Sequence, residues 1–235
     1  MTSPSPGGDR VVAIAHRGDP IGHRENTLPA FAAALAQGAD MLELDLRRTR
    51  DGAIVVLHDQ SLLRLWGLDA SVGDLDLAEV ARLGERDVRI PTLRQVLEAV
   101  PPEVELMVDF TRREVVGGAF DQAVFADALD RCLFVTGNVE ALRVLRGLSG
   151  RARIGLTWTE GPDPPLGLLG ELGAEYWNPM FSFVTAGGVD AVHEAGLRVS
   201  TWTVDTGEDM ARVVGDGVDA VVSNRVAELV GFLAR

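Results

Sequence analysis

Eight short apolar or β-branched runs alternate with helical patterns along the chain, and this alternation constrains the fold more than any other feature. The runs lie at residues 11–15, 41–46, 104–110, 133–136, 153–158, 175–178, 198–204 and 220–224. Many of the stretches between them end at glycine, as helices often do. Eight strand and helix pairs in 235 residues predict an α/β protein with a (β/α)8 TIM-barrel fold. An open, doubly wound sheet is the competing topology.

The predicted barrel is a single domain over residues 11–235, preceded by a flexible N-terminus of residues 1–10. The stretch from 47 to 91 interrupts the alternation. An additional extended run at 53–59 follows Asp51 and Gly52, a dipeptide typical of hairpin turns. We therefore expect this run to fold back beside the second strand. The polar residues after it, about 60–91, predict a small insertion.

Acidic side chains occur near the ends of two predicted strands. In a barrel, strand side chains alternate between the interior and the helix layer, and active sites lie at the C-terminal ends of the strands. Leucines at 42, 44 and 46 take the helix-facing side, so Glu43 and Asp45 point inward, as Asp109 does in the run 104–110. Adjacent carboxylates repel unless a cation lies between them, and an all-oxygen site favours Mg²⁺ or Ca²⁺. These acids are predicted metal ligands, or else they pair with arginines.

Two histidines are expected at the same end of the barrel. His16 directly follows the first strand, and His58 ends the additional run beside the second. Two imidazoles near a metal suit phosphodiester cleavage, because one removes a proton from the nucleophile and the other protonates the leaving oxygen. Arg17 can bind the phosphate through two parallel hydrogen bonds. A single histidine is more often structural, but here six polar side chains converge on one place.

Composition excludes several classes of partner. The net charge of −13 argues against nucleic acid and anionic membrane surfaces, which need a basic patch. The first ten residues contain no apolar signal-peptide core, and no stretch approaches the length of a membrane span. We therefore expect a cytoplasmic protein without stable membrane insertion. The single cysteine, Cys132, excludes an intramolecular disulfide and is predicted to be a buried thiol.

Five motifs, taken in order, resemble one known family. They are HRG at 16–18, ENT at 25–27, GADMLELDLRRTRDGAIVVLHD at 38–59, IPTL at 90–93 and TWTVD at 201–205. This combination resembles the glycerophosphodiester phosphodiesterases over residues 11 to 224. The resemblance implies a barrel with an insertion after the second strand. It also implies metal-dependent hydrolysis of small-molecule glycerophosphodiesters to glycerol 3-phosphate and an alcohol, by a monomer or a homodimer.

The resemblance also implies roles for individual residues. His16 and His58 match the acid/base pair, Arg17 a phosphate ligand, Glu43 and Asp45 two metal ligands, and Trp202 a substrate-facing tryptophan. Asp109 stands where most members carry a glutamate as the third ligand. Cleavage in the family is expected to pass through a cyclic phosphate, formed by attack of the free glycerol hydroxyl.

The chain departs from the family pattern at a phosphate-binding position. Thr111 stands where members usually carry a lysine, and all 22 basic residues of the chain are arginines. By alternation, Arg113 would share the inward face and supply the missing charge if its strand extends that far. Near the C-terminus, SNRVAEL replaces the common TDxP element, which leaves Asn224 without an assigned role. His23 and Arg24 are expected to be solvated loop residues.

Two alternative functions remain open. Thr111 and the altered last strand are also consistent with an attenuated or non-catalytic barrel that binds phosphorylated ligands. A lyase of the sphingomyelinase D type, which stops at the cyclic phosphate, is a related enzymatic alternative.

Overall fold

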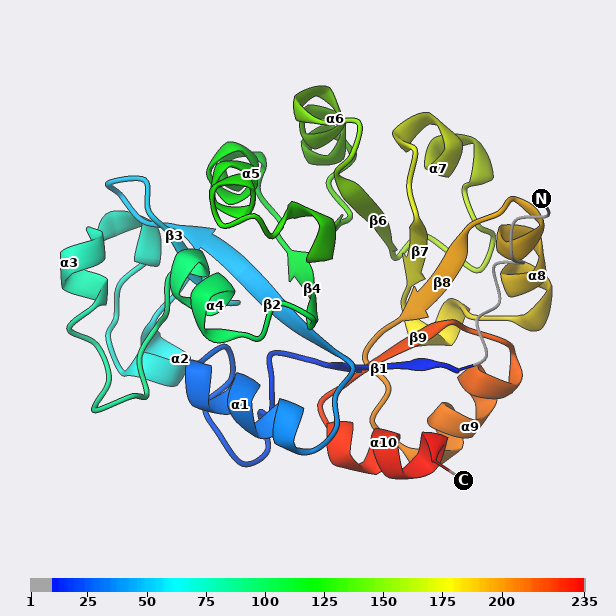
Figure 1. Cartoon of the computed structure of the whole chain (residues 1–235), viewed down its shortest axis with the longest axis horizontal. Helices are drawn as coiled ribbons and strands as arrows, with labels where there is room; N and C mark the ends of the chain where they lie inside the picture. The colour runs from blue at the N-terminus through cyan, green and yellow to red at the C-terminus, as the bar shows by residue number, and fades with distance from the viewer. Residues whose placement is uncertain (1–9, 235) are drawn as a thin grey trace.

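Eight parallel strands form a closed barrel in the computed structural model, which describes residues 10–234 (Figure 1). They are β1 (Val12–Ala15), β2 (Met41–Arg48), β4 (Glu105–Asp109), β5 (Cys132–Thr136), β6 (Arg153–Trp158), β7 (Tyr176–Pro179), β8 (Arg198–Thr201) and β9 (Ala220–Ser223). β1 pairs in parallel with both β2 and β9, which closes the ring. The predicted (β/α)8 fold is confirmed, and the open sheet is excluded. Residues 1–9, most of the predicted flexible N-terminus, lie outside the described residues.

Helices surround the barrel and connect its strands (Figure 1). The principal ones are α1 (Leu28–Ala36), α4 (Leu93–Ala99), α5 (Val116–Phe125), α6 (Val139–Leu148), α7 (Leu166–Leu172), α8 (Ala186–Glu194), α9 (Gly207–Gly215) and α10 (Val226–Leu233). Side chains cap the N-termini of five of them: Thr27, Thr92, Asn138, Thr185 and Thr206 each accept a hydrogen bond from a first-turn amide. Among the residues described, no helix is both long enough and apolar enough to span a bilayer.

The strands divide their side chains between two apolar cores. Leu42, Leu44 and Leu46 pack against the helices in the larger core, which confirms the predicted facing of β2. A smaller core inside the barrel contains Ile14, Met41, Met107, Leu133 and Tyr176. Cys132 is buried in the larger core, as predicted for a structural thiol. The interior is therefore filled with apolar side chains below the level at which the polar residues of β2 and β4 begin.

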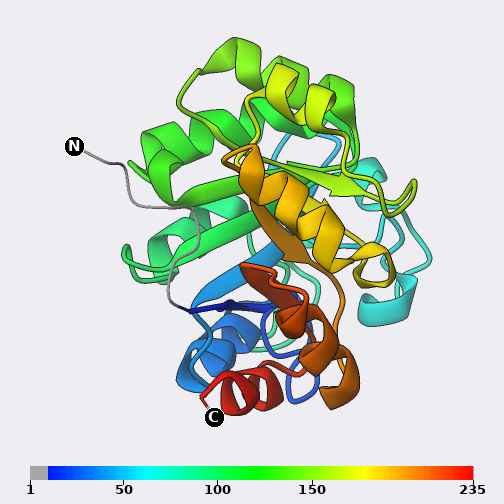
Figure 2. The same cartoon turned by 90° about the vertical axis from the view of Figure 1, so that its right-hand side faces the viewer.

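The interruption after β2 is a hairpin followed by a small lobe. β3 (Ile54–Val56) pairs antiparallel with β2, with Leu46 opposite Val56, so the predicted hairpin is confirmed. Three short helical segments follow: α2 (Leu63–Trp66), η1 (Val72–Asp74) and α3 (Leu77–Val80). This lobe has its own apolar core, formed by Val55, Leu57, Leu62, Val72, Val80 and Ile90. It projects from one side of the barrel (cyan in Figures 1 and 2).

Candidate active site

A cavity of about 230 Å³ opens at the C-terminal ends of the barrel strands. Seven of the eight residues predicted for the site line it: His16, Arg17, Glu43, Asp45, His58, Asp109 and Trp202. The other lining residues are Met107, Thr111, Val135, Thr136, Gly137, Thr157, Asn178 and Val222. The convergence expected from strand alternation is therefore present in the structure.

The three acids lie on the adjacent strands β2 and β4. Asp45 stands opposite Asp109 in the register, and Glu43 lies two residues earlier on β2. Burial, followed by the charge of Asp45, raises the pKa of Asp109 to about 7. Burial and the charges of Asp45 and Asp109 raise the pKa of Glu43 well above its ordinary value. Burial and mutual repulsion therefore both disfavour the charged forms of these two acids.

These acids fit a hard divalent cation in the chemistry of their donors, because all of them offer carboxylate oxygens and repel one another in a buried place. Within residues 10–234, no group of three His, Cys, Asp or Glu side chains is already arranged to hold a metal ion. Part of the negative charge is instead met by Arg17, whose Nε lies 3.1 Å from Asp45 Oδ2. Asn26 Nδ2 donates to the same oxygen at 2.7 Å.

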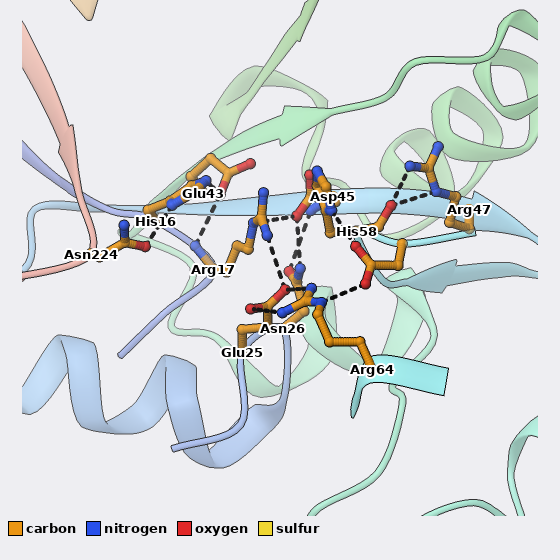
Figure 3. A network of polar contacts seen from close by, with 11 residues as sticks. His16, Arg17, Glu25, Asn26, Glu43, Asp45, Arg47, His58, Arg64 and Asn224 are labelled. Carbon is orange, nitrogen blue, oxygen red and sulfur yellow. Dashed lines mark hydrogen bonds and ion pairs between the residues drawn. The ribbon is translucent and has the colours of Figure 1, made fainter. Parts of the chain in front are cut away.

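The HRG turn fixes Arg17 against the acids. Its backbone adopts a positive φ of 57°, and its amide donates to Glu43 Oε2 at 2.9 Å. Its guanidinium donates to Glu25 Oε1, also at 2.9 Å. Gly18 is required next, because its φ is +83° and a Cβ there would lie 2.6 Å from the carbonyl carbon of Ala30. The turn therefore places a guanidinium group at the cavity wall (Figure 3).

His16 is held by a residue near the end of the chain. Its Nδ1 lies 2.7 Å from Asn224 Oδ1, and its Nε2 lies 3.9 Å from Glu43 Oε2 (Figure 3). Asn224 in turn donates from Nδ2 to Asp205 Oδ2 at 2.7 Å. Burial and the charge of Arg17 lower the pKa of His16, which favours the neutral imidazole.

His58 is held by a carboxylate instead. Its Nδ1 lies 2.7 Å from Asp59 Oδ1, and Asp59 Oδ2 accepts from Arg64 Nε at 2.6 Å. Hydrogen bonding to Arg64 is the main reason that the pKa of Asp59 falls to about 2. Arg64, on α2 of the inserted lobe, also donates to both carboxylate oxygens of Glu25. Because Glu25 binds Arg17, one arginine of the lobe links the two sides of the site (Figure 3).

The expectation for Arg113 has to be corrected. β4 ends at Asp109, and Arg113 begins the short helix η2 (Arg113–Val115), where it is exposed and does not line the cavity. Alternation cannot carry a side chain inward once the strand has ended. The cation beside Thr111 is Arg47, whose Nη1 donates to Thr111 Oγ1 at 2.6 Å while its Nε donates to the His58 carbonyl at 2.7 Å.

Sequence reasoning did not identify Glu25, Arg47, Arg64 and Asp205. Arg47 could have been found, because alternation along β2 places it on the same face as Glu43 and Asp45. Glu25 and Asp205 belong to the ENT and TWTVD motifs, which assigned them no role, and they lie in loops after β1 and β8. Arg64 comes from the inserted lobe, and no motif includes it.

Three further residues have defined surroundings. Trp202 lines the cavity, and its Nε1 donates to the carbonyl of Asn178 at 3.0 Å. His23 lies 3.2 Å from Asp19, and Arg24 stacks 4.5 Å from the ring of Trp66. Neither His23 nor Arg24 lines the cavity, which agrees with their expected placement in a loop.

Comparison with known proteins identifies the family. The model of the glycerophosphoryl diester phosphodiesterase family matches residues 16–228. A glycerophosphodiester phosphodiesterase of Caldanaerobacter subterraneus is 29% identical over 240 residues, covering 96% of this chain and 99% of the relative. A probable glycerophosphodiester phosphodiesterase 2 of Mycobacterium tuberculosis is 29% identical, covering 91% and 87%.

Solved structures agree with this assignment. The crystal structure of a glycerophosphodiester phosphodiesterase from Thermotoga maritima superposes with a TM-score of 0.82 at 25% identity, covering 94% of this chain and 97% of the other. An Oleispira antarctica phosphodiesterase in complex with the product sn-glycerol-3-phosphate has the same fold, with a TM-score of 0.88 at 23% identity, covering 96% and 98%. The chain therefore belongs to the glycerophosphoryl diester phosphodiesterase family of enzymes.

Proposed function

We propose that this enzyme hydrolyses glycerophosphodiesters to glycerol 3-phosphate and an alcohol in a metal-dependent reaction, with His16 and His58 as the acid/base pair. The observation that carries the proposal is the pairing of the two imidazoles in one cavity. Each has its Nδ1 2.7 Å from a fixed oxygen, which leaves Nε2 as the ring nitrogen that can exchange a proton with substrate.

Glu43, Asp45 and Asp109 would hold one divalent cation, Mg²⁺ or Ca²⁺. The raised pKa values of Glu43 and Asp109 support this assignment, because a cation among the carboxylates would offset both the burial and the mutual repulsion that raise them. When bound, the cation neutralises charge on the phosphate oxygens. Arg17 would bind the phosphate through its guanidinium, and Trp202 would contact the substrate from the part of the lining that follows β8.

The reaction would proceed in two steps. In the first, the free hydroxyl of the glycerol moiety attacks phosphorus and one imidazole takes its proton. The bond from phosphorus to the head-group oxygen breaks, and the other imidazole protonates this oxygen, which releases the alcohol and leaves a cyclic phosphate. In the second, water attacks phosphorus, the ring oxygen leaves, and the two histidines exchange roles, so both return to their initial states.

The test is product release by the metal-stripped enzyme. We expect glycerol 3-phosphate from glycerophosphocholine or glycerophosphoethanolamine after addition of Mg²⁺ or Ca²⁺, and release slower by about two to four orders of magnitude from the His16→Ala variant. If no product is released from a wider panel of diesters with any metal, hydrolysis is refuted. This result would favour the attenuated barrel that Thr111 suggests. Accumulation of the cyclic phosphate as the final product, detected by phosphorus NMR, would identify a lyase instead.

A further inference from the structure

Asp205 and Asn224 form a hydrogen-bonded pair behind His16. Asp205 follows β8, and Asn224 follows β9. Asp205 Oδ1 accepts from the backbone amide of Asn224 at 2.8 Å and from Ser223 Oγ at 3.1 Å. Asp205 Oδ2 accepts from Asn224 Nδ2 at 2.7 Å. The carboxylate is therefore fixed by three donors, two of which belong to the residue that contacts the imidazole.

This pair determines which way the Asn224 amide points. An ionised carboxylate is an acceptor only, so the NH₂ group of Asn224 must face Asp205 and its carbonyl oxygen must face His16. A carbonyl also only accepts, so the contact of 2.7 Å requires a proton on His16 Nδ1. Whenever the ring is neutral, its lone pair is therefore on Nε2, the nitrogen that lies 3.9 Å from Glu43 Oε2.

We infer that Asp205 and Asn224 are positioning residues, which hold His16 as the Nδ1–H tautomer with Nε2 ready to accept a proton. The inference rests on the proposed function, since it gives the tautomer a task in the reaction. His58 obtains the same restraint directly from Asp59. At His16 the amide of Asn224 lies between the imidazole ring and the carboxylate of Asp205. The amide fixes the orientation of the ring without placing a full negative charge directly against it.

The Asp205→Asn variant separates this role from a merely structural one. The new amide would offer an NH₂ group where Oδ2 now accepts, so the Asn224 amide would turn over and present its own NH₂ to His16. Nδ1 would then become the acceptor, and the proton would move to Nε2. We expect kcat to fall at least about tenfold, with KM within about twofold, because the wrong tautomer cannot take the proton.

The double exchange Asp205→Asn with Asn224→Asp supplies a rescue. The double variant again places one amide and one carboxylate behind His16. The carboxylate is now at position 224, where it accepts directly from Nδ1–H of His16. We expect it to recover most of the lost kcat, whereas Asn224→Asp alone, which opposes two carboxylates, should not. Asp219→Asn is the matched control, since Asp219 also binds a histidine, His193 at 2.9 Å, but precedes β9 at the other end of the barrel. It should leave kcat unchanged.

The tautomer itself is read from nitrogen NMR of ¹⁵N-histidine-labelled protein, in which protonated and unprotonated ring nitrogens resonate far apart. The chain has four histidines, and loss of a signal in His16→Gln assigns the one that matters. A wild-type Nδ1–H signal that moves to Nε2–H in Asp205→Asn supports the inference. A wild-type Nε2–H signal overturns it, even if no variant folds, and so does an unchanged kcat in Asp205→Asn. Full activity of His16→Gln would instead refute the proposed function, and leaves the tautomer measurement intact.

Discussion

The two walls of the cavity differ in charge. The charged wall comes from β1 to β4 and the residues that follow these strands: His16, Arg17, Glu43, Asp45, His58 and Asp109. The neutral wall comes from β5 to β9: Val135, Thr136, Gly137, Thr157, Asn178, Trp202 and Val222, none of which is ionisable. All ionisable side chains of this lining therefore lie before residue 112.

Hydrogen bonds within the neutral wall, and from the buried Ser200 behind it, order this wall. Ser200 Oγ donates to Asn178 Oδ1 at 2.9 Å, and Asn178 Nδ2 donates to Thr157 Oγ1 at 3.2 Å. Such a surface can shape the space for a glycerol or head-group moiety without altering the charge at phosphorus. From this difference we propose that one half of the barrel supplies the reactive groups and the other half shapes the substrate-binding space, and four predictions test this division.

The largest effect is expected from the histidines of the charged wall. His16→Ala and His58→Ala should each lower kcat by about two to four orders of magnitude, as loss of a general acid or base does. The measurement is steady-state release of glycerol 3-phosphate. His193→Ala, on the outer helix α8, is the control and should keep wild-type kcat. Equal rates for all three variants would remove the basis for assigning catalysis to this wall.

Glu43→Gln should weaken metal binding by about 10- to 100-fold, because it removes a charged ligand while keeping the size of the side chain. Isothermal titration calorimetry with Mg²⁺ and Ca²⁺ measures the change. The raised pKa of Glu43 means that its charged form is already disfavoured in the folded protein. A neutral glutamine of similar size should therefore leave the fold intact. Unchanged affinity for both ions would contradict the ligand assignment.

A matched pair of substitutions compares the walls directly. Thr111→Val removes a hydroxyl that accepts from Arg47 at the edge of the charged wall, and Thr157→Val removes one from the neutral wall. If Thr111 occupies the phosphate-binding position of the family, loss of its hydrogen bond to the charged phosphate, about 1.5 kcal/mol, should raise KM about tenfold in Thr111→Val. KM should change by less than about twofold in Thr157→Val. The reverse order would place the phosphate against the neutral wall.

The smallest effect concerns acid stability. The pKa of Asp59 is lowered to about 2 in the folded protein, so its contribution to stability is complete above its unfolded pKa, near 4, and is lost as pH falls through 2. Asp59→Asn should therefore flatten the decline in unfolding free energy between about pH 4 and pH 2, as measured by urea titrations. Thr157→Val, in the neutral wall, should leave the slope of this decline unchanged.

The sequence was informative about the charged wall because its residues follow a local rule. Alternation in the runs 41–46 and 104–110 was enough to turn Glu43, Asp45 and Asp109 inward, and the turn dipeptide at 51–52 indicated the hairpin that brings His58 to the site. The same rule failed for Arg113, because the end of β4 depends on tertiary packing that alternation does not encode.

Contacts between distant segments could not be predicted. Asn224 contacts His16 across 208 residues, and Arg64 contacts Glu25 across 39. Each depends on how a loop or the inserted lobe is seated on the finished barrel. The pattern of polar and apolar residues along one chain indicates on which face of a strand or helix a side chain lies. It does not indicate which side chains from separate loops come into contact.

The contact of His16 with Asn224 also bears on when the protein can become active during its own synthesis and folding. The charged wall is encoded in the first half of the chain, but its first histidine acquires its orienting partner only when β9 docks beside β1. An incomplete barrel would carry the reactive groups without the restraint that aligns them. With the roles proposed for His16 and Asn224, turnover reports ring closure, and its recovery after dilution from denaturant should follow the pairing of β9 with β1 rather than the first collapse.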